Sequence, residues 1–460
     1  MNQDPQHTAP TEAEQRQYCE QLEGAIALYL EGDIIAKVRL TNLTSSDSGI
    51  RAQVDLLHNF APNPRSKLPK PTWHMSSTWQ FAPTCDVWSM PYVGFKAYFD
   101  PELLARVEEH ALGLSPELTP QDRYRSLRRF ISDFFRPKPL SVREQIQADV
   151  EALAEPGGRA VGTEGHQFAR VYLDSRLRRL KLKPYAGTSS RLLYAANGIP
   201  FTNLAALLPG TSPGASPLLV GAHYDTCGPT PGADDNAAAI AAVLAAVTHL
   251  QAKPLARDLI VAFFDAEEPP YFHQDCMGST TFYRSQRTGP IDCAFILDLV
   301  GHDVPIPGLE SLLFITGMES HSALEQVLLS AEVDPRIKIV AASNSYVGDM
   351  SDHHVFRLHD IPYLFFSCGR WQHYHAPTDT PDKLNYDKIE AIASSLADII
   401  RSCDACQFPA AGRTYDSTPT ELLLMNRTLG PFLQKQRLPQ PRTRADLDEI
   451  AATLLSQFRL

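Results

Sequence analysis

Three carboxylates and one imidazole lie close together in a single segment, Gly221–Asn236, which reads GAHYDTCGPTPGADDN. The carboxylates belong to Asp225, Asp234 and Asp235, the imidazole belongs to His223, and no lysine or arginine lies among them. Acidic side chains repel one another and are costly to bury unless a positive charge sits between them. The segment therefore predicts a bound cation whose remaining ligands come from other parts of the chain.

Further acids and a second histidine follow other apolar segments. Glu267 and Glu268 follow the run LIVAFF, Asp298 ends the segment DCAFILD, and His375 comes after IPYLFFSCG. In an open α/β sheet, functional side chains collect beyond the carboxyl ends of the strands, where the loops converge. We therefore expect these residues and His223 to meet at one edge of a sheet.

The types of ligand narrow the choice of metal. Imidazole nitrogens together with carboxylates favour zinc, with cobalt or manganese as substitutes, whereas calcium and magnesium prefer oxygen ligands alone. A single catalytic zinc ion takes about three protein ligands and a water molecule. More candidate ligands than one ion needs indicate two ions that share a bridging carboxylate, about 3.5–4 Å apart.

Two short motifs suggest supporting roles for neighbouring acids. In His223-Tyr224-Asp225 the two polar residues lie on the same side of an extended segment, so Asp225 can orient the imidazole. Glu267 and Glu268 leave the backbone in different directions. One of them can therefore ligate a metal while the other accepts a proton from a bound water molecule.

The order of these motifs resembles that of zinc-dependent exopeptidases of the bacterial leucyl aminopeptidase type. That family also includes glutaminyl cyclases and glutamate carboxypeptidase-like proteins. The motifs are HYD, GADDN, the double glutamate, LD after an apolar run, SDHHVF and YHAPTDTPDKL. The resemblance extends over residues 140–404 and includes the segment GRAVGTEGHQFARVYLDSRL.

The resemblance implies a role for individual residues. The implied ligands of two zinc ions are His223, Asp234, Glu268, Asp298 and His375, with Asp234 bridging the ions. Glu267 is the implied general base, and Asp225, which the HYD motif places beside His223, is the second expected catalytic residue. The family has a cis peptide bond after its bridging aspartate, which is expected here between Asp234 and Asp235. Candidates for support of the ligands or for substrate contact are Asp235, Asp352, His353 and Tyr374.

The implied activity is the removal of N-terminal residues from peptides by a metal-activated water molecule, but two alternatives stay open. The long link Pro269–Met277 after the double glutamate is similar to that of glutaminyl cyclases, which use one zinc ion. The paired Asp234-Asp235 and the tyrosine before His375 favour the peptidase. A catalytically silent binding scaffold of the same fold would have lost ligands, and none of the implied ligands is missing.

Composition excludes some partners and indicates a compartment. The net charge of −11 argues against a nucleic-acid or anionic membrane surface, both of which need clustered lysine and arginine. No apolar run approaches the roughly 18 residues that span a bilayer, and the N-terminus lacks the pattern of a secretory signal. The eight cysteines are scattered, which fits reduced thiols and predicts a cytoplasmic location.

The pattern of apolar residues divides the chain into three parts. Residues 1–138 contain strand-like and then helix-like segments and predict a small α+β domain of unknown role. Residues 139–408 alternate continuous apolar runs with helical stretches, which predicts an α/β domain around a mixed, mostly parallel sheet flanked by helices. Residues 409–460 form a helical extension.

The extension carries an apolar stripe, and the loops of the central part carry aromatic residues. Leu447, Ile450 and Leu454 recur at helical spacing, so we expect the stripe to pack on the chain's own body. A homo-oligomer formed through this helix or through the N-terminal domain is the alternative. The aromatic residues Phe272, Tyr346, Trp371 and Tyr374 are candidates either to line a substrate pocket or to pack in the core.

Overall fold

A computed structural model describes most of the chain and divides it into two compact units, Met1–Pro139 and Leu140–Leu460. The described residues are 20, 23–24, 26–31, 34–46, 49–60, 80–82, 87–89, 96–98, 101–114, 119–134, 140–212, 214–413 and 415–458. The second unit includes the predicted catalytic domain and the C-terminal helices together.

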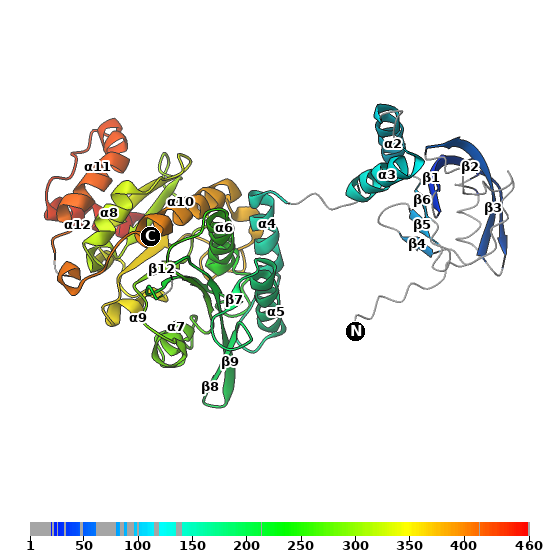
Figure 1. Ribbon diagram of the computed structural model, residues 1–460. Helices are drawn as coiled ribbons and strands as arrows, with labels where there is room; N and C mark the ends of the chain where they lie inside the picture. The colour runs from blue at the N-terminus through cyan, green and yellow to red at the C-terminus, as the bar shows by residue number, and fades with distance from the viewer. Residues whose placement is uncertain are drawn as a thin grey trace. The chain divides into compact units, whose positions relative to one another are not determined.

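The first unit combines an antiparallel sheet with two helices (Figure 1). Its described strands, in sheet order, are β3 (Gly49–Asn59), β2 (Ile34–Ser46), β1 (Ile26–Glu31), β6 (Lys96–Tyr98), β5 (Val87–Ser89) and β4 (Gln80–Ala82). Helices α2 (Pro101–Gly113) and α3 (Pro120–Phe134) pack against the sheet through Leu103, Val107 and Leu127, which join Leu28 and Ile35 in one core. The predicted α+β architecture is confirmed.

The second unit is built on a larger mixed sheet with four parallel strands at its centre. In order along the sheet, the strands are β14 (Lys338–Ala342), β13 (Leu312–Thr316), β15 (Tyr363–Ser367), β12 (Cys293–Leu297), β10 (Leu218–His223), β11 (Leu259–Phe264), β9 (Ile199–Leu208) and β7 (Lys183–Pro184), and β8 (Arg191–Ala196) pairs with β9. Strands β15, β12, β10 and β11 run parallel, whereas β9 runs antiparallel to β11 and β13 runs antiparallel to β15. The carboxyl ends of the four parallel strands therefore share one edge.

Helices cover both faces of this sheet, which explains why its central strands are apolar throughout. One face packs against α4 (Val142–Leu153), α5 (Glu164–Arg179), α6 (Ala239–Ala252), α8 (Ala323–Ser330) and α10 (Tyr386–Asp404). The other face packs against α9 (His353–Leu358) and the segment that follows α7 (Gly278–Thr281). Every residue of β10, β11 and β12 is buried, as expected for strands covered on both sides. The predicted fold class is confirmed.

The C-terminal helices α11 (Thr418–Lys435) and α12 (Arg444–Phe458) pack on the body of the second unit. Leu447 is fully buried, and Ile450 and Leu454 pack against the same core. At the start of α12, Arg444 makes two hydrogen bonds of 2.8 Å to the carboxylate of Glu421, which is buried in α11. The apolar stripe of the extension is thus used within the chain.

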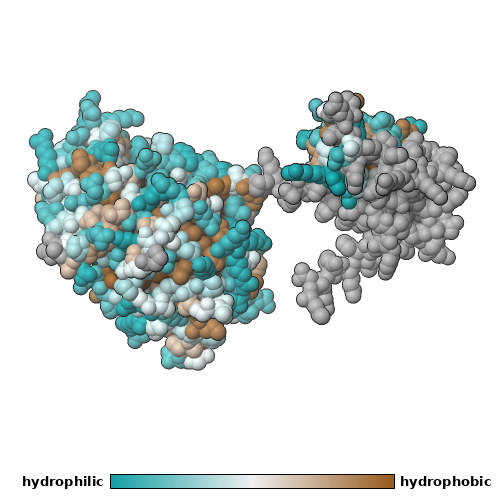
Figure 2. All heavy atoms as spheres, in the orientation of Figure 1, coloured by the Kyte–Doolittle hydropathy of each residue, from teal (hydrophilic) through white to brown (hydrophobic). Residues whose placement is uncertain are grey.

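The surface of the second unit is mixed in character. On the face drawn in Figure 2, hydrophilic residues surround smaller hydrophobic patches. Among the residues that the structure describes, no helix combines the length and the apolar character needed to cross a membrane.

Candidate metal centre

The predicted acids and histidines gather at the carboxyl edge of the four parallel strands. His223 is the last residue of β10, and Asp298 directly follows β12. Glu267 and Glu268 follow β11 after Ala266, whose φ of 55° turns the chain sharply at the end of the strand. His375 lies in the loop after β15. The strand order therefore brings together residues as far apart in the sequence as His223 and His375.

The carboxylate of Asp235 lies between the two imidazoles. Its Oδ1 atom is 3.3 Å from Nε2 of His223, and its Oδ2 atom is 3.2 Å from Nε2 of His375. A carboxylate that offers one oxygen to each imidazole has the arrangement expected of a ligand shared by two ions. Asp235, which the sequence had suggested only as a supporting residue, thus lies between the two imidazoles.

Asp234 does not occupy the bridging position that the sequence predicted for it. Its Oδ1 accepts a hydrogen bond from the backbone N–H of Gly301 at 2.6 Å, and its Oδ2 pairs with Nδ1 of His302 at 2.6 Å. The expected cis peptide bond likewise lies one residue later, between Asp235 and Asn236. Neighbouring side chains leave the tight turn Ala233–Ala238 in different directions, so only one of the two aspartates faces the imidazoles.

The other predicted ligands divide between the two imidazoles. Next to Nε2 of His223 lie Oδ1 of Asp298 at 3.5 Å and Oε2 of Glu267 at 3.8 Å. Next to Nε2 of His375 lies Oε2 of Glu268 at 3.1 Å. The double glutamate is therefore split, with one carboxylate on each side of Asp235.

Asp225 holds the double glutamate in place. Its two carboxylate oxygens accept hydrogen bonds from the backbone N–H groups of Glu267 and Glu268, each at 3.0 Å. The same carboxylate lies 3.5 Å from Nδ1 of His223, which is the neighbour that the HYD motif suggested. Asp379 holds the segment with Asp234 and Asp235 in place in a similar way. Its carboxylate accepts hydrogen bonds from the backbone N–H groups of Asp234 at 2.9 Å and of Asp235 at 3.1 Å.

Arg159 lies beneath the acids and was not anticipated from the sequence. It is 1% exposed, and its guanidinium donates hydrogen bonds to the backbone carbonyls of four residues, which are Leu153, Tyr224, Pro231 and Gly232. Burial lowers the pKa of Arg159 to about 10, although Asp235 and other nearby acids act to raise it. Its place in the quoted segment GRAVGTEG gave no signal that this arginine is buried.

Burial and the close spacing of charges shift the pKa values of the groups at the site. Burial raises the pKa of Glu268 to about 8, and it also raises the pKa values of Glu267 and Asp298. Burial alone would lower the pKa of His375, but hydrogen bonds to Asp235 and Glu268 raise it to about 10. The protein thus buries several acids that are hard to ionise together without additional positive charge.

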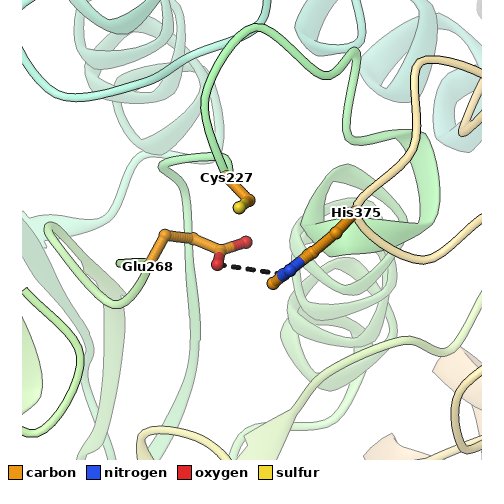
Figure 3. A group of neighbouring side chains, drawn as sticks. All are labelled: Cys227, Glu268 and His375. Carbon is orange, nitrogen blue, oxygen red and sulfur yellow. Dashed lines mark ion pairs between the residues drawn. The ribbon is translucent and has the colours of Figure 1, made fainter. Parts of the chain in front are cut away.

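Several buried atoms at this edge have no hydrogen-bond partner in the described part of the chain. They are both ring nitrogens of His223, Oε1 of Glu268 and Oδ1 of Asp298. Three overlapping groups of possible metal ligands have their ligand atoms within 4.8 Å of one another: His223, Asp235 and Asp298; His223, Glu267 and Glu268; and Cys227, Glu268 and His375 (Figure 3). Unpaired nitrogen and oxygen atoms of this kind fit divalent cations of the zinc type.

The three remaining candidates have different surroundings. Asp352 is fully buried, neither carboxylate oxygen has a hydrogen-bond partner, and burial raises its pKa to about 7. His353 instead packs in the core, where its ring stacks on Phe365 and its Nε2 bonds the carbonyl of Gly348 at 3.0 Å. Tyr374 stacks on the ring of His375 with 3.8 Å between centroids.

A cavity of about 430 Å³ opens onto the acids. It is lined by the polar residues Asp235, Glu267, Glu268, Asp298 and His375 and by the larger side chains Phe272, Tyr346, Met350, Tyr374 and Leu455, among others. Its size is in the range of small-molecule sites. Trp371, an aromatic candidate from the sequence, stacks on His302 instead, with ring centroids 4.5 Å apart. Leu455 comes from α12, so the C-terminal extension contributes to the wall of this cavity.

Comparisons with known proteins show what the segment that carries the site is similar to. Residues 203–400 match the model of Peptidase family M28. The uncharacterized protein YfbL of Escherichia coli is 29% identical over 237 residues, which are 44% of this chain and 71% of that protein.

Two solved structures are similar to part of this chain. A glutaminyl cyclase from Tannerella forsythia has a TM-score of 0.45 at 19% identity, over 56% of this chain and 98% of that one. A leucine aminopeptidase precursor from Bacteroides thetaiotaomicron has a TM-score of 0.45 at 18% identity, over 56% of this chain and 96% of that one. The site residues from His223 to His375 all lie within the segment that matches the family model. The match to the Peptidase family M28 model over residues 203–400 confirms the resemblance recognised in the sequence for that segment.

Proposed function

We propose that this protein is a dinuclear zinc aminopeptidase. The observation that carries the proposal is the position of Asp235, whose two oxygens lie 3.3 and 3.2 Å from the imidazoles of His223 and His375. One ion would be held by His223, Asp235 and Asp298, and the other by His375, Asp235 and Glu268. Every one of these residues lies within the segment that matches peptidase family M28.

The residues around the ions supply the remaining parts of the reaction. Bound zinc would lower the pKa of a water molecule to about 7 and polarise the scissile carbonyl group. Glu267 accepts the proton of the attacking water and delivers it to the leaving amine. The raised pKa of Glu267, caused first by its burial, suits a group that must both take and release a proton. The surplus of carboxylates favours the positively charged amino terminus of a peptide.

A small apolar compartment next to the cavity suggests which residue is removed. It has a volume of about 90 Å³ and is lined by the apolar side chains of Phe314, Val340, Ala342, Met425, Ala451 and Leu454, together with others. It shares Tyr346, Phe365 and Leu455 with the main cavity. We infer that it accepts an apolar side chain at the N-terminus of the substrate.

A glutaminyl cyclase with one zinc ion is the second candidate, favoured by the long link Pro269–Met277. Pro269 and Phe272 from this link line the cavity, so the link contacts whatever occupies it. In that reaction the substrate's own amino group attacks its glutaminyl amide and releases ammonia. The two candidates differ in metal content and in product.

Metal content and product release distinguish the two candidates directly. We expect purified protein to hold close to two zinc ions per chain and to hydrolyse aminoacyl p-nitroanilides. Elemental analysis and the release of p-nitroaniline measure the two quantities, with an N-terminal glutaminyl peptide assayed in parallel. One zinc ion per chain, with ammonia released from the glutaminyl peptide alone, would establish the cyclase instead.

Substitution of Glu267 tests its role as the general base. Glu267→Gln keeps the shape of the side chain but removes the proton acceptor, so we expect kcat to fall by about 10²–10⁴-fold. The zinc content should stay unchanged, because Glu267 is not a proposed ligand. Glu332→Gln, at an exposed position, is the matched control. Loss of zinc from Glu267→Gln would mean that Glu267 and Glu268 have exchanged roles.

Substitution of Asp234 and of Asp235 by asparagine gives a matched pair of variants that tests which of the two binds metal. Asp235→Asn should lose zinc and activity, because it weakens a ligand of both ions. Asp234→Asn should keep its zinc, because an amide can still accept from Gly301 N–H and donate to Nδ1 of His302. Elemental analysis of both variants, with their thermal unfolding as a check of folding, measures the difference. Loss of zinc from Asp234→Asn but not from Asp235→Asn would instead identify Asp234 as the ligand shared by both ions.

Filling the apolar compartment tests its role in specificity. Ala451→Leu adds an isobutyl group to its wall, so we expect the ratio of kcat/KM for leucyl over alanyl p-nitroanilide to fall by about tenfold or more. Ala452→Leu places the same side chain at an exposed position of the same helix and should leave the ratio unchanged. Equal ratios in both variants and the unmodified protein would exclude this compartment as the specificity pocket.

A further inference from the structure

A thiol lies beside the carboxylate and imidazole of one of the two proposed ion positions. Cys227 follows β10 by four residues, and its Sγ atom forms a group with a carboxylate oxygen of Glu268 and a ring nitrogen of His375. All three atoms lie within 4.8 Å of one another. Figure 3 shows the three side chains pointing into one common space from different segments of the chain.

Glu268 provides an independent sign that this space takes a ligand. The residue is only 3% exposed, and its Oε1 atom has no hydrogen-bond partner, whereas Oε2 pairs with His375 at 3.1 Å. A buried carboxylate oxygen without a partner is costly unless a cation or a hydrogen-bond donor occupies the neighbouring space. The thiol of Cys227 borders that same space.

The backbone on both sides of Cys227 is fixed by hydrogen bonds. The hydroxyl of Thr230 donates to the carbonyl of Cys227 at 3.0 Å, and the hydroxyl of Thr226 donates to the carbonyl of Gly228 at 3.1 Å. The hydroxyl of Thr226 also accepts from the N–H of the buried Arg159 at 2.7 Å. These contacts hold the thiol in the position where it borders the site.

We propose that Cys227 is a thiolate ligand of the ion held by Glu268 and His375. The inference rests on the proposed two-ion site, because Glu268 and His375 belong to both. With Asp235, this ion would have four protein ligands, which is the complete set that tetrahedral zinc takes in closed sites. A thiolate is a soft ligand that favours zinc over manganese or magnesium, so the two positions differ in metal preference.

This asymmetry assigns the open coordination position to the other ion. The ion at His223, Asp235 and Asp298 has three protein ligands, which is the number that leaves room for water in catalytic zinc sites. Glu267 lies on this same side, with its Oε2 atom 3.8 Å from Nε2 of His223. The general base therefore stands next to the position where a water molecule can bind.

Cobalt substitution tests the proposal without the use of a substrate. Protein stripped of zinc and reconstituted with Co²⁺ should show a sulfur-to-cobalt charge-transfer absorption in the near ultraviolet. Cys227→Ser should abolish this absorption and lower the affinity for one of the two ions at least about tenfold, measured by competition with a chelator. Cys276→Ser, which changes another partly exposed thiol, is the matched control and should keep both properties.

The spectrum of the unmodified protein decides the proposal even where a variant folds poorly. If cobalt-treated protein shows no charge-transfer absorption, or if the absorption persists in Cys227→Ser, Cys227 is not a ligand. Both results are independent of peptidase activity, which is measured separately with zinc. An active enzyme without the absorption would thus overturn the assignment of Cys227 alone, whereas an inactive enzyme with it would overturn the proposed peptidase function.

Discussion

The burial of many acids around two imidazoles is the constraint on which the rest of the second unit depends. Asp225, Asp235, Glu267, Glu268 and Asp298 are each at most 7% exposed. Such acids repel one another, so the backbone must hold them against this repulsion until a cation binds. Asp225 and Asp379 do so by accepting pairs of backbone N–H groups, and the buried guanidinium of Arg159 adds a positive charge beneath them.

The acids consequently divide into two kinds according to what their oxygens contact. Asp225, Asp234 and Asp379 direct their carboxylates to backbone N–H groups or to a second histidine, and thereby fix the loops. Asp298 and Glu268 each keep a buried oxygen without a hydrogen-bond partner. Position along the chain does not distinguish these two kinds of contact, since both occur at the same strand ends.

This distinction explains what the sequence could and could not predict. The central strands were predictable because strands covered on both faces must be apolar throughout, and the positions of His223, Asp298 and the double glutamate follow from their ends. The sequence favoured Asp234, whereas the structure directs Asp235 between the imidazoles. Two adjacent acids carry the same local signal, and only the geometry of the turn separates them. Arg159 was missed for a related reason, since its partners are backbone carbonyls that leave no pattern in the sequence.

The C-terminal extension, which the family model does not cover, contributes to the cavity at the site. That match ends at residue 400, yet Leu455 of α12 lines the cavity at the acids. The helix is held there by the bonds between Arg444 and Glu421 and by the fully buried Leu447. The positions of the acids and imidazoles follow from the ends of the strands, whereas the space beside them also depends on what packs over that edge of the sheet. In this chain, the wall of the cavity therefore combines side chains of the matched segment, such as Phe272 and Tyr346, with Leu455 of the C-terminal extension, so the match alone does not define the shape of the cavity.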